Sequence, residues 1–438
     1  MSQFLYIPLS LSMVISAATI KVTVEVEETV CTVGNPNNGA GALWCYGAPL
    51  IARISERVFV SAMEVGEDIQ PLCNTRPRIF MRYEDKWRLV WRPDEFLERE
   101  PCPIVCFQND QFILSVNPLI DATESRRGAC NPHLLKFSVS NLDEPPQKLQ
   151  PKWVDDTTFT EHSYRGIAAD GARGEILLLN IDAKTGEQCW SFCDASGNWV
   201  NCGRIRFPIR ACYPQVELRN RAAHVLAIGD IVEPIEEWRR YKHEKTKRDW
   251  DYVFRRLFYT WTPDAATTDF AAPIEVENVD TTGGHISNLD LWVDANGDAH
   301  LLYIKQPVAP LLREGFFPNL RLTKSLEYCI IKRGEVVSRN TLLISGENIS
   351  GDTPNYARLH ATPDGRLFAI YACSPSGMKI MPISPQIAEP IKLELQKPFH
   401  TFFTASERSG SNRSNVIDIL GIASEPGKLR YARVRLIP

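Results

Sequence analysis

An all-β fold is predicted by three features of the 438-residue sequence. Short runs of alternating apolar and polar residues recur along the chain, and turn signals, among them many of the 25 glycines and 30 prolines, separate them. Convincing amphipathic helical stretches are nearly missing. A hairpin pattern, clearest at residues 284–303, places two strands around the turn Asp294-Ala295-Asn296-Gly297 and returns in altered form several times. Such strand periods and turns are typical of β proteins built from repeats.

The repeated hairpins predict a seven-bladed β-propeller of four-stranded blades. Their first strands begin near residues 44, 103, 162, 211, 286, 355 and 400. The intervals average roughly 60 residues, within reach of a four-stranded blade with loop insertions. More polar runs behind each hairpin, such as 327–332 and 335–337, fit the outer strands. A six- or eight-bladed ring and two stacked β-sandwiches are the alternatives.

The two ends of the chain are expected to share the last blade. That unit has one clear outer strand, at residues 429–436, so the strand at 20–27 would complete it and close the ring. Closure removes free sheet edges, which otherwise promote aggregation. Residues 19–438 then form a single propeller domain. Two insertions interrupt the repeats: residues 236–250, expected as a short helix or long loop and a candidate basic wall beside the binding face, and residues 308–324.

Residues 1–18 are expected to be a signal peptide. An apolar run at 4–18 ends in Ser16-Ala17-Ala18, small residues of the kind found at signal-peptidase sites, although the positively charged leader is missing. This run is short for a membrane span, and no later segment is long and apolar enough to be one. The sequence thus predicts a secreted or periplasmic protein without a membrane span, expected as a monomer. An apolar first strand is the alternative.

The charge and the cysteine content limit which partners and cofactors the sequence predicts. The net charge is −4 with both signs interspersed, so no clustered basic face for nucleic acid is predicted. The 12 cysteines lack zinc-knuckle and CxxC spacing, and several lie in strand-like runs as small buried hydrophobes. In an exported chain we expect one or two disulfides, in the region of Cys189, Cys193 and Cys202. No cofactor is predicted. A metal ion at a histidine-rich face of the propeller is left as an alternative, although no ligand spacing in the sequence indicates one.

The candidate site comes from propeller geometry. Innermost strands surround a central channel, so the starts of successive repeats meet on one face. These starts are rich in His, Tyr, Arg and Asn. Aromatic rings suit stacking on sugars, arginines suit a carboxylate or sulfate, and His and Tyr suit proton transfer. The candidate catalytic residues are His285, His162, Tyr164 and Tyr213. The candidate substrate-binding residues are Arg165, Arg210, Asn288, Arg358, Tyr356, Trp44, Tyr46 and His400.

This set favours elimination on a uronic-acid or sulfated polysaccharide. Arg or Asn would neutralise the substrate carboxylate and acidify the C5 proton, His or Tyr would remove that proton, and Tyr could protonate the leaving oxygen. Glycoside hydrolysis on the same scaffold would need a carboxylate pair about 5–10 Å apart, with Glu161, Asp290 and Asp352 as candidates. Asp294 and Asp364 are better explained as turn residues. A non-catalytic propeller that binds a glycan or a protein is the other alternative.

The hairpin from His285-x-x-Asn288 into Asp294-Ala-Asn-Gly297-Asp-Ala-His300 resembles the sialidase-like, BNR-type propeller repeats of secreted carbohydrate-active proteins. Among these it is similar to repeats of ulvan-lyase-type polysaccharide lyases. The resemblance implies a His and Tyr pair drawn from His285 or His162 and Tyr164 or Tyr213, with Arg165 or Arg210 in the same cleft. True sialidases fit less well. Residues 191–199 only approximate their Ser-x-Asp-x-Gly-x-x-Trp box, and their N-terminal Arg-Ile-Pro signature is missing.

Overall fold

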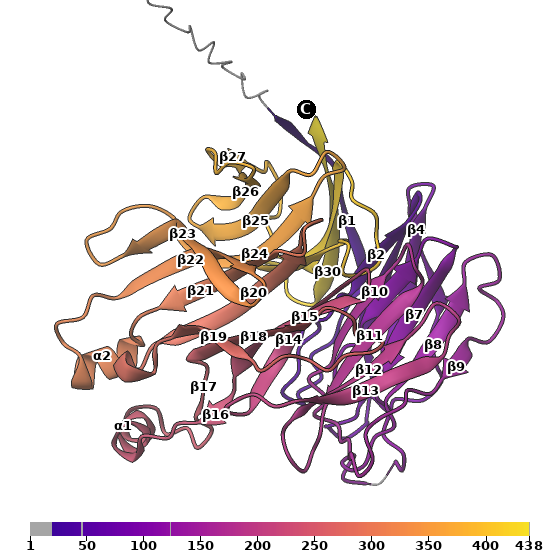
Figure 1. Cartoon of the computed structure of the whole chain (residues 1–438), viewed down its shortest axis with the longest axis horizontal. Helices are drawn as coiled ribbons and strands as arrows, with labels where there is room; N and C mark the ends of the chain where they lie inside the picture. The colour runs from indigo at the N-terminus through magenta and orange to yellow at the C-terminus, as the bar shows by residue number, and fades with distance from the viewer. Residues whose placement is uncertain (1–19, 45–46, 123, 438) are drawn as a thin grey trace, which may run out of the picture.

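Seven four-stranded antiparallel sheets form a β-propeller in the computed structural model, which describes residues 20–44, 47–122 and 124–437 (Figure 1). Each innermost strand contacts the innermost strand of the next blade, and β28 of the last blade contacts β2 of the first. The predicted fold class and the predicted number of blades are therefore confirmed. The predicted signal peptide at 1–18 lies outside the described residues.

The strands of each blade follow one another from the channel outward. Blade 1 contains β2 (Ile51–Ile54), β3 (Arg57–Val65), β4 (Thr75–Tyr83) and β5 (Lys86–Trp91). Blade 2 contains β6 (Ile104–Phe107), β7 (Gln111–Val116), β8 (His133–Ser138) and β9 (Gln147–Leu149). Blade 3 contains β10 (Gly166–Asp170), β11 (Glu175–Ile181), β12 (Gln188–Cys193) and β13 (Trp199–Ile205). Blade 4 contains β14 (Ala211–Arg219), β15 (Ala222–Gly229), β18 (Arg256–Thr262) and β19 (Ile274–Asn278).

The remaining three blades follow the same order. Blade 5 contains β20 (His285–Val293), β21 (Ala299–Gln306), β22 (Thr323–Lys332) and β23 (Glu335–Gly346). Blade 6 contains β24 (Thr353–Ala361), β25 (Leu367–Ser374), β26 (Gly377–Ser384) and β27 (Ile391–Lys392). Blade 7 contains β28 (Thr401–Thr404), β29 (Val416–Ile422), β30 (Lys428–Ile437) and β1 (Lys21–Thr32). The first blade begins later than expected, at Ile51, so Trp44 lies in the segment before β2.

The outermost strand of blade 7 comes from the N-terminal end of the described chain. β1 pairs antiparallel with β30, from Lys21 opposite Ile437 to Thr32 opposite Lys428. The two strands lie side by side at the top of Figure 1. Because β29 pairs with the other edge of β30, the C-terminal strand has a partner on both sides.

The hairpin turns repeat the same hydrogen bonds in different blades. Asp294 accepts hydrogen bonds from the backbone N–H groups of Asn296 and Asp298, at 2.8 and 2.9 Å. Gly297 in this turn has a φ of +83°, a conformation that favours glycine. Asp194 accepts equivalent bonds from Ser196 and Asn198, both at 2.9 Å. The turn aspartates thus serve the architecture, as the sequence predicts for Asp294.

The apolar cores lie between neighbouring blades. Trp190 and Phe192 of blade 3, for example, pack in one cluster with Val216 and Val225 of blade 4. Each blade therefore buries its faces against the next, which fixes the angle between blades and the positions of their innermost strands. Every cysteine that the structure describes is a free thiol. The disulfide expected near Cys189, Cys193 and Cys202 is wrong, because Cys202 of β13 lies opposite Ser191 rather than opposite a cysteine.

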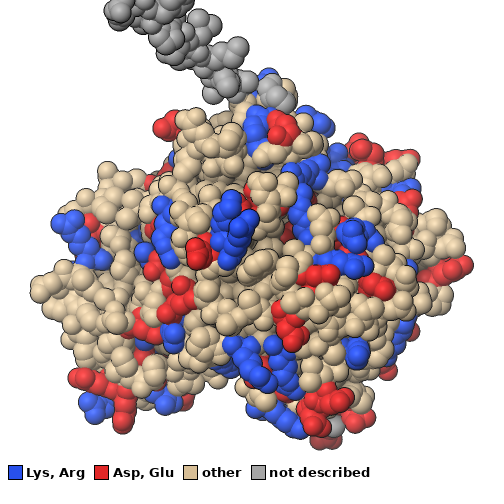
Figure 2. All heavy atoms as spheres, in the orientation of Figure 1, with Lys and Arg blue, Asp and Glu red and all other residues tan. Residues whose placement is uncertain are grey.

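Both predicted insertions contain helices. The first holds α1 (Glu236–Thr246) between the short strands β16 (Ile231–Val232) and β17 (Tyr252–Val253), and the second holds α2 (Pro310–Phe316). A 3₁₀ turn, η1 (Asp280–Thr282), precedes blade 5. No helix among the described residues is long and apolar enough to cross a bilayer. Lys and Arg are interspersed with Asp and Glu over the face shown in Figure 2.

Candidate active site

An open cavity of about 690 Å³ lies on the face where the innermost strands begin, which we call the upstream face. The cavity lies at blades 3 and 4, around the start of β10 and the start of β14. It brings together five of the predicted site residues: Trp44, His162, Tyr164, Arg210 and Tyr213. Trp250 and Tyr252, from the first insertion, complete its aromatic lining.

Tyr164 and Tyr213 pack against each other in the aromatic part of the lining. Their rings meet edge to face with centroids 5.1 Å apart, and the ring of Trp44 lies 5.5 Å from that of Tyr213. Tyr164 and Tyr213 both have positive φ, at 41° and 53°. A left-handed conformation is uncommon for an aromatic residue and is found mainly where the surroundings hold the chain in place, often at functional sites.

Glu100 holds Tyr164 in this conformation. Its buried carboxylate accepts hydrogen bonds from the backbone N–H groups of Ser163 and Tyr164, both at 3.2 Å, and from the Ser163 hydroxyl at 2.6 Å. Arg99 donates to the same carboxylate at 3.0 Å and itself lines the cavity. One buried acid therefore fixes both the tyrosine turn and a cation beside it.

Two arginines provide positive charge in the cavity. The guanidinium of Arg210 lies 5.1 Å from the centre of the Tyr164 ring and forms an ion pair with Asp230 at 2.8 Å. Arg99 bonds Glu100 and also donates from Nε to the carbonyl of Asn38 at 3.2 Å. A guanidinium has five donors in a planar fork, so each arginine can bind an anion while it keeps these partners.

His162 lies at the open side of the cavity. Its side chain is 46% exposed, and its ring stacks on that of Tyr164 with centroids 6.4 Å apart. Partial burial, together with the nearby charge of Arg99, lowers the pKa of His162 below its ordinary value of 6.5. Burial raises the pKa of Tyr164 above its ordinary value of 10. At neutral pH the histidine is therefore neutral and the tyrosine protonated.

The carboxylates of the cavity are committed to ion pairs. Asp230 pairs with Arg210, and Asp182 accepts a hydrogen bond from Arg204 at 2.6 Å. Burial alone would raise the pKa of Asp182, but the hydrogen bonds from Arg204 and from the Lys184 N–H outweigh it and lower that pKa to about 2. Asp182 is thus ionised at neutral pH and is not a proton donor.

The candidate hydrolytic carboxylates do not gather at this site. Asp352 pairs with Lys379 at 2.7 Å next to blade 6, and Asp290 pairs with Arg358 in the central channel. Glu161 lies nearer, next to His162, but its carboxylate accepts the N–H of Gly128 at 3.3 Å. These three acids therefore belong to three separate places in the ring.

Several predicted site residues instead hold the ring together. Arg358 is buried in the channel, where it donates to Leu289 O at 2.8 Å and to the hydroxyl of Tyr356. Asn288 donates to the carbonyl of Tyr213 at 2.7 Å, which links blades 4 and 5. Arg165 donates to Ser115 O at 3.1 Å and pairs with Glu98, which links blades 2 and 3. The structure therefore places Arg358, Tyr356, Asn288 and Arg165 in the packing of the ring rather than in the cavity.

His285 and His400 also lie outside the cavity lining. His285 stands one aromatic ring away, because Phe254 contacts both His285 and Tyr213 with centroids 5.9 Å apart in each case. Burial lowers the pKa of His285 to about 4. His400 is exposed at the start of blade 7, and its backbone N–H donates to Ile422 O at 2.8 Å. Tyr46 lies outside the described residues.

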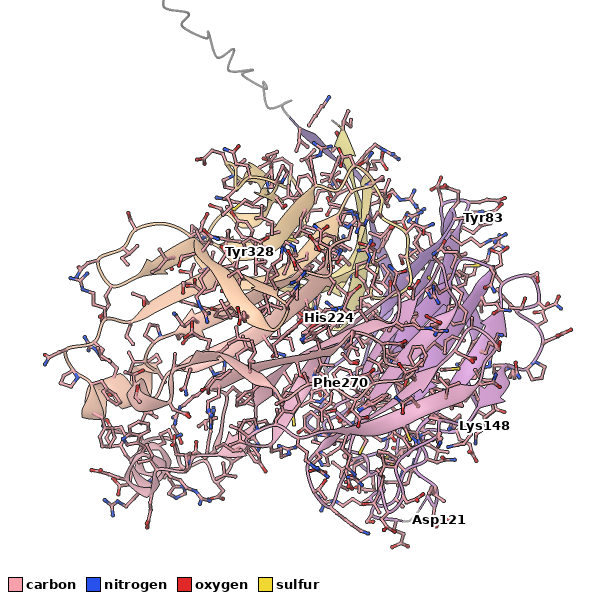
Figure 3. The ribbon with its side chains drawn as sticks, in the orientation of Figure 1. Tyr83, Asp121, Lys148, His224, Phe270 and Tyr328 are labelled. Carbon is pink, nitrogen blue, oxygen red and sulfur yellow. The ribbon has the colours of Figure 1, made fainter. Side chains whose placement is uncertain are left out.

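Buried histidines of the second strands are structural. In β15, Nδ1 of His224 lies 2.6 Å from the hydroxyl of Tyr259, and in β21, Nδ1 of His300 lies 2.6 Å from the hydroxyl of Tyr328 (Figure 3 labels His224 and Tyr328). Burial lowers the pKa of both histidines to about 4. They are neutral core residues, as the sequence predicts for His300. In the part of the chain that the structure covers, no group of three or more His, Cys, Asp or Glu could hold a metal ion.

Comparison with known proteins supports the fold. No family model matches the chain, and no curated protein matches it by sequence. An ulvan lyase structure superposes with a TM-score of 0.53 at 8% identity, over 87% of this chain and 90% of that chain. A lectin from Burkholderia pseudomallei superposes with a TM-score of 0.50 at 10% identity, over 89% and 94% of the two chains. A prolyl endopeptidase is matched at 11% identity with a TM-score of 0.43, over 85% of this chain and 44% of its own.

Sequence reasoning missed Arg99, Glu100, Asp230, Trp250 and Tyr252. Arg99 and Glu100 precede the first strand of blade 2, and Asp230 directly follows the second strand of blade 4, so none of them opens a repeat. A signal existed in the Glu98-Arg99-Glu100 triplet, where charges of opposite sign lie just before an apolar strand and could be buried there only as pairs. Trp250 is the last residue of the insertion at 236–250, predicted from sequence as a candidate basic wall beside the binding face, and Tyr252 lies two residues beyond it.

Proposed function

We propose that this protein is a carbohydrate-active enzyme that cleaves an acidic polysaccharide by β-elimination in the upstream cavity. The observation that carries the proposal is the stacked pair of a neutral, half-exposed His162 and a protonated, buried Tyr164 beside Arg99 and Arg210. Aromatic walls suit sugar rings, and two arginines suit a uronate carboxylate or a sulfate. The ulvan lyase likeness is consistent with this proposal at the level of the fold.

His162 is the proposed base. It is accessible, and its lowered pKa leaves a ring nitrogen free to accept a proton at neutral pH. A uronate C5–H becomes acidic enough to lose its proton only when the adjacent carboxylate is neutralised. Arg99 and Arg210 are the candidates for this neutralisation, because both line the cavity that holds His162.

Tyr164 is the proposed acid. As the C5 proton passes to His162, the C4–O4 bond breaks, and the electron pair of the C5–H bond forms the C4–C5 double bond. The departing oxygen takes the hydroxyl proton of Tyr164, whose raised pKa keeps that proton available at neutral pH. Proton exchange with solvent then restores His162 and Tyr164. Tyr213 and Trp44 supply aromatic surface for the sugar ring.

Hydrolysis is less well supported by the same cavity. Glycoside hydrolysis requires a carboxylic acid that is protonated at the working pH. It also requires a second carboxylate that either activates a water molecule or attacks the sugar. Asp182 is strongly ionised, and Asp230 is paired with Arg210. The chemistry of the cavity thus favours a His and Tyr elimination over a two-carboxylate reaction.

Incubation with a panel of ulvan, alginate, polygalacturonate and hyaluronan tests the proposal. We expect one polysaccharide to develop the ultraviolet absorbance of a C4–C5 double bond. Tyr164→Phe and His162→Gln should each lower that rate by about 10²–10⁴-fold, the usual contribution of general acid–base catalysis. Tyr83→Phe is the matched control, because Tyr83 is exposed on blade 1, far from blade 4 in Figure 3.

The two products separate the alternatives. New reducing ends without new absorbance would identify a hydrolase. Binding of a panel member without either signal would identify a glycan-binding propeller. Unchanged turnover in both Tyr164→Phe and His162→Gln would exclude this cavity as the reaction centre.

A further inference from the structure

The connection between β15 and β18 forms an excursion, residues 230–255, that projects from blade 4. It consists of β16, α1 and β17, with Ile231 opposite Val253 and Val232 opposite Tyr252. Figure 1 shows it at the lower left, below the sheet of blade 4 and near α2. Its second arm returns past the mouth of the cavity, where Trp250 and Tyr252 belong to the lining.

A buried ion-pair network fixes the base of the excursion. Glu233 accepts two hydrogen bonds from Arg255, at 2.9 and 2.6 Å, and one from Lys242 at 2.8 Å. Lys242 also bonds Asp251, the residue between the two aromatic ones, at 2.6 Å. Trp238 is buried where α1 meets α2. The arm that carries Trp250 and Tyr252 therefore has a defined position.

The large apolar side chain of Trp250 is unusually exposed to solvent. Its side chain is 66% accessible, the largest fraction among the large hydrophobic residues that the structure describes. An indole that stays in water forgoes the stabilisation that burial of its apolar surface would bring. Here that surface lines a cavity in which charged groups stand beside aromatic rings, since Arg99, Arg210 and Asp230 share the lining. A ligand with both apolar faces and polar edges, such as a sugar ring, fits this combination.

The aromatic rings continue from the rim to the proposed acid. The Trp250 ring lies 5.4 Å from that of Tyr252, which in turn lies 6.0 Å from the Arg210 guanidinium. The same guanidinium lies 5.1 Å from the centre of the Tyr164 ring. An extended chain of linked sugars could therefore contact aromatic or cationic groups at each step from Tyr164 outward.

We propose that Trp250 and Tyr252 form a separate sugar-binding subsite, where a residue of the glycan chain beyond the cleaved bond stacks on the indole. This inference rests on the proposed function, and it adds that the preferred ligand is a chain longer than a disaccharide. A polymer would bind across the rim of blade 4, with its reacting unit at Tyr164 and a further unit on the excursion.

Binding of oligosaccharides of increasing length tests the subsite. The probes are a disaccharide and longer oligosaccharides from the panel polysaccharide that the wild-type protein binds or cleaves, titrated into the Tyr164→Phe background. We expect Trp250→Ala to raise the Kd of the longer oligosaccharides about five- to tenfold and to leave the disaccharide unchanged. Trp250→Phe should restore most of the affinity, because it keeps an aromatic face. Tyr83→Ala, which removes an exposed aromatic ring distant from the excursion, should change neither Kd.

The outcomes separate this inference from the proposed function. Equal affinity of Trp250→Ala and its background for every length would overturn the subsite while leaving the reaction centre untouched. Equal weakening for the disaccharide and the longer probes would also overturn it, because Trp250 would then belong to the reaction centre. A wild-type protein that neither binds nor cleaves any panel member would overturn both proposals.

Discussion

At the scale of single residues, the site depends on one buried acid that never needs to touch substrate. Glu100 accepts hydrogen bonds from the adjacent backbone N–H groups of Ser163 and Tyr164 and from the Ser163 hydroxyl, and it pairs with Arg99. The proposed acid and a proposed carboxylate receptor therefore share one anchor. Positive φ at Tyr164 is disfavoured by on the order of 1–3 kcal/mol, and the Glu100 bonds offset that strain.

Replacing Glu100 should destabilise the fold as well as the site. Glu100→Ala leaves Arg99 as a buried cation without this partner, so we expect the free energy of unfolding to fall by about 3–5 kcal/mol. Glu100→Gln keeps the shape and one acceptor oxygen, so we expect a loss of about 1–3 kcal/mol. Urea unfolding measures both. The exposed Glu144→Ala is the control and should stay within about 0.5 kcal/mol of wild type. An alanine variant as stable as this control would contradict the role of Glu100.

Some residues of the site could be predicted from sequence. The others could not, because local irregularities of the strands decide which side chains face the cavity. Tyr164, His162, Tyr213, Arg210 and Trp44 followed from the rule that repeat starts meet on one face. The same rule also selected Asn288 and Tyr356, which lie in the ring packing. Register shifts interrupt β14 between Cys212 and Gln215, β20 between Asn288 and Asp290, and β24 between Pro354 and Tyr356. A bulge changes which side chains face the channel, and its position cannot be read from strand alternation.

At the scale of elements, the position of the blade 4 excursion depends on a buried group of charges. Glu233 and Arg255 are both buried, and Lys242 joins them. Burial alone would raise the pKa of Glu233, but Arg255 and Lys242 outweigh it and lower that pKa below its ordinary value of 4.5. The stabilisation is therefore fully present above about pH 4.5 and is lost as the pH falls through the lowered pKa.

Glu233→Ala should open the excursion without unfolding the blades. The variant leaves Arg255 buried without its carboxylate, so we expect faster hydrogen–deuterium exchange in residues 231–253 at neutral pH and unchanged exchange in β14 and β15. Acidification of the wild type toward the lowered pKa should reproduce the effect in part. Glu144→Ala removes an exposed acid from blade 2, which is separate from the excursion, and serves as the control. Exchange in 231–253 that matches this control would show that Glu233 does not hold the excursion.

The sequence anticipated this element only in outline. Mixed charge at 236–250 predicted a helix or loop beside the binding face, and α1 occupies most of that range. What the sequence could not indicate is that the chain doubles back through β17 and brings Trp250 to the cavity. That contact depends on the pairing of Ile231 with Val253, a register that two-residue strands specify weakly in sequence.

At the scale of the whole molecule, the buried polar residues of the channel hold the blades together, whereas the accessible polar residues line the cavity on the upstream face. Arg358 and Arg408 both donate to Gln215, at 3.2 and 2.7 Å, and Arg408 also pairs with Asp290. These buried groups tie blades 4 to 7 together across the channel. The repeat pattern was sufficient to predict seven blades because each blade must bury its faces against neighbours of the same architecture. It was not sufficient to predict which repeats carry the site.

The pH dependence of kcat/KM on the cleaved polysaccharide tests the central claim most directly. We expect the rate to rise with pH as His162 loses its proton, with a midpoint below 6.5 because burial lowers that pKa. The rate should then stay level up to about pH 10, the ordinary pKa of a tyrosine, because burial raises the pKa of Tyr164 above that value. A rate that is highest at acidic pH and falls toward neutrality would instead report a protonated carboxylic acid as the donor. That result would contradict the assignment of His162 and Tyr164.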